Sequence, residues 1–261
     1  VGSLCALTAE SLSEEHREHL RAYGEAAADI AAQLESMQAK LHEGNVEMDT
    51  REKRLLNVGG GEKPVLVLNF ANPVNIGGGV YRGARAQEED LCRRSSLLRS
   101  LESGGAERYY RYNRGLRTYM GSDAVILSPE VEVFRDEDYA FLEETAVVAV
   151  ATCAAPMITG GLEGMSEGEY RDMFYRRITG LLKCAAHFGY EDLVLGAWGC
   201  GAFGNDAALV SDLFCCALEE FRFGGLRARD LFRNVVFAVR SRGGESYNYR
   251  EFRRNFGIWD G

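Results

Sequence analysis

The sequence predicts an α/β fold in which helices cover both faces of a central, largely buried sheet. Segments rich in Val and Leu, typical of buried strands, alternate with segments of helical periodicity. The chain has 261 residues, 46% of them hydrophobic, so it can form one large domain or one domain with an extension. We therefore assign residues 1–56 to an N-terminal helical extension packed on the core, and residues 57–261 to a single core domain.

The N-terminal extension contains a long amphipathic helix, predicted at residues 12–43. We expect its apolar face to pack on the protein's own core, and a coiled coil is the alternative. The apolar residues that define this face recur at spacings of three and four: Leu20, Tyr23, Ala27, Ile30, Leu34, Met37 and Leu41. A loop at residues 57–64 then leads into the core domain.

The first half of the core domain begins with a buried strand at residues 64–72, followed by a helix at 87–103. The short strands that come next are predicted at residues 124–127, 131–134 and 145–152. We expect Ser128 and Pro129 to separate the first two of these, because proline has no N–H for the strand ladder.

The second half of the core domain continues the alternation of helix and strand. Ser166 and Glu169 form the pattern of a capping box and predict the start of a helix at residues 166–188. The elements after it are a strand at 192–198, a glycine-rich loop at 199–205, a helix at 206–223, a strand at 234–240 and a helix at 249–256.

The composition excludes several classes of function. A net charge of −9 gives no general positive field for sequence-specific binding of nucleic acid, so an anionic ligand has to be held by local donors. No apolar run approaches the roughly 20 residues of a membrane span, and no signal-peptide pattern precedes the first helix. We expect a cytoplasmic protein that does not bind membranes and is a monomer.

The cysteines and histidines predict neither a disulfide framework nor a zinc site. The seven cysteines include no C-x-x-C pair, and the four histidines do not cluster with them. This pattern indicates a reducing compartment and no bound metal, with Cys92, Cys184, Cys215 and Cys216 expected as buried structural thiols. The remaining cysteines are Cys5, Cys153 and Cys200, and the histidines are His16, His19, His42 and His187.

A glycine run followed by two adjacent carboxylates is the first chemical motif. Gly77, Gly78 and Gly79 lie between the first strand and the helix that opens with Gln87-Glu88-Glu89. Glycine allows a ligand to approach the backbone closely, and a helix N-terminus favours a bound anion. The glycines at residues 59–61 lack a following acidic pair, so glycines alone indicate little.

The second motif is the loop at residues 199–205, which follows a strand and precedes a helix. Its backbone N–H groups predict a cradle for a diphosphate. The loop also fits G-x-G-x-x-G, so a nicotinamide-dependent oxidoreductase is an alternative, but Glu219 and Glu220 fall on a helix instead of at a strand end. Phe203 either packs on a ribose or base, or anchors the loop to the core.

Taken together, the two motifs resemble those of the bacterial-type poly(ADP-ribose) glycohydrolases, a branch of the macrodomain superfamily. The resemblance covers nearly the whole chain and implies a three-layer α/β/α macrodomain with a mixed central sheet and an N-terminal helical extension. It implies that residues 57–261 form a catalytic domain whose ligand is ADP-ribose or poly(ADP-ribose), with ADP-ribosylated proteins as partners and no cofactor. Open alternatives are a non-catalytic ADP-ribose-binding macrodomain and a hydrolase of mono-ADP-ribosylated targets.

The resemblance also assigns roles to individual residues. Glu89 is implied as the catalytic acid/base, Glu88 as its neighbour that orients ribose hydroxyls, and Asn72 as a ribose contact. The other ligand-binding residues that it implies are Gly77, Gly78, Gly79 and Gln87, and the diphosphate loop of Gly199, Cys200, Gly201, Ala202, Phe203, Gly204 and Asn205.

The chemistry of a glycosidic bond fits a single carboxyl that acts first as an acid and then as a base. The leaving oxygen has to be protonated, and water has to reach an oxocarbenium-like carbon. A general acid at neutral pH needs a raised pKa, which burial, a neighbouring carboxylate and a bound diphosphate favour and a helix N-terminus opposes. Four arginines near the motif either bind phosphates or pair with the acidic residues: Arg82, Arg85, Arg93 and Arg94.

Overall fold

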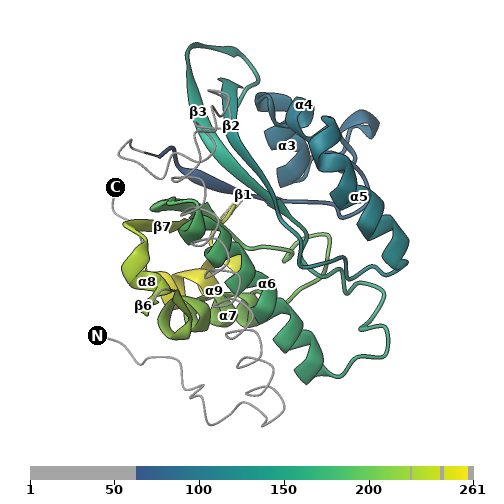
Figure 1. The fold of residues 1–261 in the computed structure, drawn as a ribbon, viewed down its shortest axis with the longest axis vertical. Helices are drawn as coiled ribbons and strands as arrows, with labels where there is room; N and C mark the ends of the chain where they lie inside the picture. The colour runs from purple at the N-terminus through teal and green to yellow at the C-terminus, as the bar shows by residue number, and fades with distance from the viewer. Residues whose placement is uncertain (1–62, 224, 242–243, 258–261) are drawn as a thin grey trace, which may run out of the picture. The chain divides into compact units, whose positions relative to one another are not determined.

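The structure is a computed structural model that describes residues 63–223, 225–241 and 244–257 (Figure 1). These residues belong to one compact unit, Glu62–Gly261. The extension predicted at residues 1–56, its helix at 12–43 and most of the loop at 57–64 lie outside the described residues.

A five-stranded mixed sheet forms the centre of the unit, with the strand order β2-β3-β1-β4-β7. β1 pairs in parallel with both β3 and β4, β4 pairs in parallel with β7, and β2 is antiparallel to β3. The bounds of the strands are β1 Leu66–Phe70, β2 Ile126–Arg135, β3 Phe141–Cys153, β4 Asp192–Leu195 and β7 Asn234–Phe237. The predicted α/β fold with a buried central sheet is confirmed.

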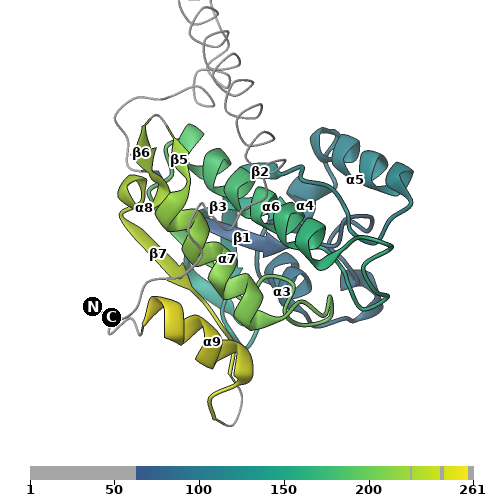
Figure 2. The same ribbon diagram turned by 90° about the horizontal axis from the view of Figure 1, so that it is seen from below.

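Helices cover both faces of this sheet, as Figures 1 and 2 show. Leu66 and Leu68 point into the larger apolar cluster, which includes residues of α6, α7 and α9, whereas Val67 packs in a smaller cluster with α3 and α4. This alternation follows from the two-residue period of a strand buried on both faces. The helix bounds are α3 Gln87–Arg94, α4 Leu97–Leu101, α5 Gly104–Leu116, α6 Glu167–His187, α7 Ala207–Glu220 and α9 Tyr247–Phe256.

Several predicted boundaries are wrong: the strands expected at 192–198 and 234–240 end at Leu195 and Phe237, and two breaks lie elsewhere than predicted. The helix expected at 87–103 is divided at Ser95, whose backbone is extended and whose hydroxyl donates to the Leu91 carbonyl at 2.7 Å. The break expected at Ser128 and Pro129 is only a register shift within β2. Because β2 is an edge strand of the described sheet, a proline there does not have to donate to a second neighbour.

Several elements of the structure were not predicted. α5 was not predicted because it begins with two glycines, which have low helix propensity. Its buried face includes Tyr109, Tyr110 and Asn113. The helix expected at 206–223 ends at Glu220, because the chain turns there into a small hairpin. The bounds of the other unpredicted elements are η2 Val80–Arg82, β5 Arg222–Phe223, β6 Leu226–Arg227 and α8 Ala228–Leu231.

Other local predictions agree with the structure. Ser166 caps α6, where its hydroxyl accepts the Glu169 N–H at 3.2 Å and completes the predicted capping box. Cys92 and Cys216 are buried, whereas Cys184 and Cys215 are only partly buried. Within the described residues, no helix combines the length and the apolar composition that crossing a membrane requires.

Candidate active site

Both sequence motifs lie at the same edge of the sheet. The first follows β1 and the second follows β4, and these two strands are parallel neighbours. The carboxyl ends of parallel strands meet at one edge, which is where α/β proteins bind ligands. The fold thus brings together two segments that are more than a hundred residues apart in the sequence.

Glu88 occupies a buried position below the first motif. One carboxylate oxygen accepts the Asn72 N–H at 2.7 Å, and the other accepts the side-chain amide of Asn69 at 3.4 Å. Burial raises the pKa of Glu88 to about 8, and the charge of Glu89 adds to the rise, while the two hydrogen bonds oppose it. Glu88 is therefore mainly protonated at neutral pH, so the negative neighbour expected beside Glu89 is present only at higher pH.

Glu89 is held by the backbone on both sides of its carboxylate. Oε1 accepts the Gly79 N–H at 2.8 Å, and Oε2 accepts the Ala86 N–H at 2.8 Å. The second of these is the reciprocal bond of a capping box at the start of α3. With only 6% of its surface exposed, Glu89 is a buried carboxylate and not an exposed acid of a surface helix.

Gly78 explains why this motif needs a glycine. A Cβ at Gly78 would lie 2.3 Å from Glu89 Oε1 and 2.8 Å from Glu88 Oε2, and its φ of +62° is unfavourable for other residues. A side chain at Gly77 would lie 2.8 Å from Leu98, and one at Gly79 would lie 2.8 Å from Ala84. The glycines let the backbone approach the two carboxylates, and their contact with a ligand stays a prediction.

Gln87 and Asn72 support the same arrangement. The side-chain oxygen of Gln87 accepts the Phe70 N–H at 2.8 Å, and its amide donates to the Leu68 carbonyl at 2.7 Å. Asn72 accepts the N–H groups of Val74 and Asn75 through Oδ1, at 3.0 and 2.8 Å. Gln87 therefore ties α3 to β1. Ligand binding by Gln87 and Asn72 remains a prediction. The Asn72 side-chain NH₂ group, which makes no hydrogen bond within the described residues, is the group that would contact the ligand.

The second motif presents consecutive backbone donors. The N–H groups of Cys200, Gly204 and Asn205 already donate to carbonyls within the turn. Between them lie Gly201, Ala202 and Phe203, whose N–H groups form no hydrogen bond within the described part of the chain. In the predicted donor run of residues 199–205, the Gly199 N–H is likewise unused among the described residues, and the three consecutive groups at 201–203 can face a diphosphate together.

Asn205 holds this loop in place. Its side-chain amide donates to the Pro156 carbonyl at 2.8 Å and to the Gly199 carbonyl at 2.9 Å, and its oxygen accepts the Tyr170 hydroxyl at 2.6 Å. Gly199 has no room for a side chain, because a Cβ would lie 2.3 Å from the Asn205 amide. Phe203 is partly buried against the larger core cluster, so it anchors the loop, and its contact with a ribose stays a prediction.

The four arginines near the first motif divide into two groups. Arg93 donates to the carbonyls of Val80 and Ala84 and so fastens the loop before α3. Arg94 forms an ion pair with Asp90 at 3.0 Å. Of its two predicted roles, phosphate binding or pairing with an acidic residue, the structure shows the second. Arg82 and Arg85 are exposed, so phosphate binding by them stays a prediction.

Asn69 is a site residue that the sequence did not indicate. It is fully buried within β1 and donates to Glu88 and, at 3.2 Å, to the Thr152 hydroxyl. A polar residue in an otherwise apolar strand was its only signal. Among the residues described, no three His, Cys, Asp or Glu side chains are grouped so as to hold a metal ion.

Comparisons with known proteins agree with this arrangement. Residues 8–136 match the family model of the microbial-type PARG catalytic domain. The search of curated proteins gave no significant match.

Solved structures resemble most of the chain. Poly(ADP-ribose) glycohydrolase from Deinococcus radiodurans, in complex with ADP-ribose, is 36% identical with a TM-score of 0.67, over 78% of this chain and 79% of that one. The enzyme from Thermomonospora curvata is 38% identical with a TM-score of 0.68, over 78% and 72% of the two chains. Its form bound to the inhibitor ADP-HPD is 37% identical with a TM-score of 0.67, over 79% and 75%. This chain therefore belongs to the microbial-type poly(ADP-ribose) glycohydrolases, a family of glycoside hydrolases.

Proposed function

We propose that this protein hydrolyses the ribose–ribose O-glycosidic bonds of poly(ADP-ribose) and releases ADP-ribose, with Glu89 as the acid/base. One observation carries the proposal: a backbone-fixed Glu89 and the donor run at residues 201–203 belong to the segments that follow the adjacent parallel strands β1 and β4. Relatives that are 36–37% identical are described in complex with ADP-ribose, which supports the same ligand here.

The two motifs divide the ligand between them. The N–H groups of Gly201, Ala202 and Phe203 bind the diphosphate, because successive backbone donors form a concave site for an anion. The terminal ribose lies between this loop and Glu89. Asn72 contributes its side-chain amide, which donates to no acceptor among the described residues, to a ribose hydroxyl, as the family resemblance implies.

Protonated Glu88 suits the role of orienting the ribose. With a pKa of about 8, it carries a proton that it can donate to a ribose hydroxyl at neutral pH. It also adds no negative charge near the diphosphate at that pH. The two adjacent glutamates thus have different tasks, a hydrogen-bond donor at Glu88 and a proton-transfer group at Glu89.

Glu89 performs the two proton transfers of the reaction. It first donates a proton to the oxygen that leaves with the neighbouring unit, while the bond from that oxygen to the ribose carbon breaks and its electron pair goes to the oxygen. The Glu89 carboxylate then takes a proton from a water molecule as the water oxygen bonds to the same carbon. The products are ADP-ribose and a polymer shortened by one unit.

The test compares wild type with Glu89→Gln on poly(ADP-ribose), following released ADP-ribose. We expect the variant to lose about 10²- to 10⁴-fold in kcat, the usual contribution of a general acid/base, with ADP-ribose affinity largely kept. Glu191→Gln is the matched control, because it removes an exposed carboxylate at the start of β4. An inert wild type would refute the function, and equal activity of Glu89→Gln would refute the mechanism.

A parallel assay separates the alternatives. Wild type is incubated with a mono-ADP-ribosylated protein, and loss of the modification is measured beside polymer shortening. Removal of the single unit without polymer shortening would identify a hydrolase of mono-ADP-ribosylated targets. Binding of ADP-ribose with no turnover of either substrate would identify a non-catalytic binding domain.

A further inference from the structure

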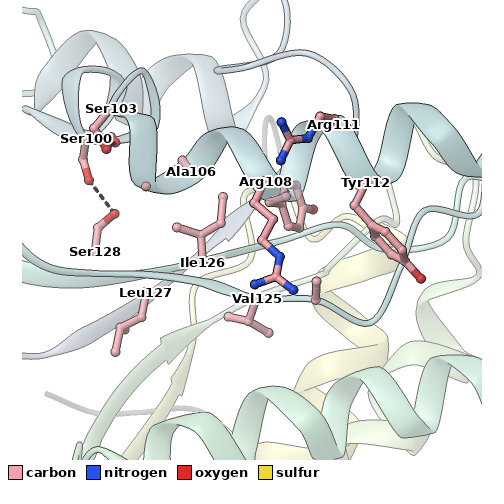
Figure 3. A pocket seen from close by; sticks show the side chains of 13 residues that line it. Ser100, Ser103, Ala106, Arg108, Arg111, Tyr112, Val125, Ile126, Leu127 and Ser128 are labelled. Carbon is pink, nitrogen blue, oxygen red and sulfur yellow. Dashed lines mark hydrogen bonds between the residues drawn. The ribbon is translucent and has the colours of Figure 1, made fainter.

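A groove outside the two motifs lies between α5 and the beginning of β2. It has a volume of about 850 Å³, and Figure 3 shows its lining. At one end of the groove the hydroxyls of Ser100 and Ser128 form a hydrogen bond 2.8 Å long. Val125, Ile126 and Leu127 form its apolar side.

The α5 side of the groove is positively charged. Arg108 and Arg111 line it and are exposed, and Arg111 also forms an ion pair with Glu107 at 4.0 Å. In Figure 3 the Arg108 side chain extends from α5 toward Val125. Arg108 has no hydrogen-bond or ion-pair partner in the part of the chain that the structure describes. Two exposed arginines on one side of a groove, in a chain of net charge −9, favour an anionic ligand there.

An aromatic ring stands beside these cations. Tyr112 also lines the groove, and 57% of its surface is exposed. Exposed rings next to cationic side chains are the combination with which proteins bind nucleotide chains, because bases stack on the ring and phosphates pair with the cations. The groove therefore offers the chemistry that recognises an adenine together with a diphosphate.

The groove lies beside the active site, on the side away from the diphosphate loop. Asn69 of β1, Thr152 of β3 and Ile126 of β2 form one row across the sheet, so Ile126 is two strand spacings, about 10 Å, from the strand position next to Glu88. Arg114 joins α5 to the catalytic loop by donating to the Val74 carbonyl at 3.1 Å. The diphosphate loop follows β4, on the opposite side of β1.

The order of these sites matches the order of groups in the polymer. A terminal unit with its diphosphate on the loop after β4 and its ribose at Glu89 directs the next unit away from β4, toward β3 and β2. We propose that the groove binds the adenine and diphosphate of the polymer unit next to the scissile bond. This inference rests on the proposed function and adds a second subsite to it.

The test removes two charges from the groove and compares the polymer with free ADP-ribose. For Arg108→Gln/Arg111→Gln we expect KM for poly(ADP-ribose) to rise roughly 3- to 10-fold, and the salt dependence of polymer affinity to fall by about one unit of slope per arginine. Since free ADP-ribose fills only the catalytic subsite, its Kd and the kcat for polymer stay unchanged. The matched control is Arg222→Gln/Arg250→Gln, which removes two exposed arginines outside the groove.

A second pair of variants tests the aromatic contact. Tyr112→Ala raises KM for polymer, and Tyr112→Phe restores it, because stacking needs the ring and not the hydroxyl. The inference is overturned if the groove and control variants change KM equally, if neither changes it, or if the Kd of ADP-ribose rises in step. If wild type releases no ADP-ribose, the proposed function is refuted. The affinity of the Glu89→Gln protein for polymer, measured with and without the groove arginines, then still shows whether the groove binds the polymer.

Discussion

The two loops of the active site are built in opposite ways. After β1, side chains face the reaction and the backbone holds them: Glu89 is fixed by the N–H groups of Gly79 and Ala86. After β4, the backbone faces the ligand and a side chain holds it: Asn205 fixes the turn by bonds to Pro156 and Gly199. Side chains face the ligand and the backbone supports them in the first loop, whereas in the second loop the backbone faces the ligand and a side chain supports it.

This difference follows from what each loop presents. A buried carboxylate has to be surrounded by donors, since an unpaired buried charge is strongly destabilising. The catalytic loop therefore surrounds Glu89, which is 6% exposed, with backbone donors, and the still more buried Glu88, 3% exposed, retains its proton. The donors at Gly201 and Ala202 are exposed and are solvated by water until a ligand replaces it. We expect the first loop to tolerate little change in backbone spacing, and the second to depend on its anchor.

Adding one methyl group to each loop tests this expectation most directly. In Gly78→Ala the new Cβ displaces both carboxylates and adds left-handed backbone strain, about 1–2 kcal/mol. Misplacing a catalytic group by about 1 Å can lower the rate about 100-fold, so we expect kcat to fall by that order. The measurements are steady-state kinetics on poly(ADP-ribose) and calorimetry with ADP-ribose.

Gly201→Ala is the matched control in the second loop. A Cβ at Gly201 meets no atom within 4 Å, and its φ is not in the left-handed region. We expect the free energy of unfolding to stay within about 0.5 kcal/mol of wild type and kcat within about twofold, because the added methyl group displaces no side chain. Comparable losses of kcat in both variants would show that the loops do not differ in tolerance.

Removing the anchor of the second loop has a smaller effect on turnover than on binding. Asn205→Ala breaks the bonds to Pro156, Gly199 and Tyr170, and we expect the free energy of unfolding to fall by about 2–4 kcal/mol. Because the donors at residues 201–203 lose their fixed direction, Kd for ADP-ribose rises about tenfold, which is about 1.4 kcal/mol. Denaturant unfolding and calorimetry measure the two quantities.

Tyr170→Phe separates the anchor from general destabilisation. It removes one of the three bonds and leaves both amide contacts to carbonyls, so we expect a loss of about 1 kcal/mol in stability and an unchanged Kd for ADP-ribose. A Kd that rises equally in both variants would mean that the loop donors do not depend on the Asn205 amide.

Elements with local signals could be predicted from the sequence, and those set by tertiary contacts could not. The capping box at Ser166 marked the start of α6, and the apolar run at residues 64–72 marked β1. α5 was missed because Gly104 and Gly105 have poor helix propensity, whereas burial of Tyr109 and Tyr110 stabilises the helix. The continuity of β2 through Pro129 depends on its place at the sheet edge, which the sequence does not encode locally.

The site shows the same limit. The adjacency of Glu88 and Glu89 at a helix start could be read directly, and so could the glycine loop before α7. The protonation of Glu88 could not, because it arises from burial against residues such as Asn69, far from it in the chain. The donor run at residues 201–203 is distinguished from its neighbours only by the hydrogen bonds within the turn.

The protonated Glu88 leads to a further predicted effect, a dependence of stability on pH. Its pKa is about 8 in the folded protein against 4.5 for an ordinary glutamate. Between these values the unfolded chain releases a proton that the folded protein retains, so this group's contribution to stability falls as pH rises from about 4.5 to about 8 and then levels off. Unfolding of wild type and Glu88→Gln across this range measures the difference, on the order of a few kcal/mol.

The ionisation of Glu88 also predicts that the affinity for ADP-ribose depends on pH. Above pH 8 the ionised Glu88 places a negative charge near the diphosphate, and we expect Kd for ADP-ribose to rise about 3- to 10-fold between about pH 7 and 9. Glu88→Gln keeps an acceptor for the Asn72 N–H but cannot ionise, so its Kd stays flat over the same range. The phosphates of the ligand are fully ionised throughout, so a rise in wild type alone assigns the titration to Glu88. A flat wild-type curve, or an equal rise in the variant, would refute the hypothesis that Glu88 is protonated at neutral pH. It would also refute the separate tasks proposed for the two glutamates.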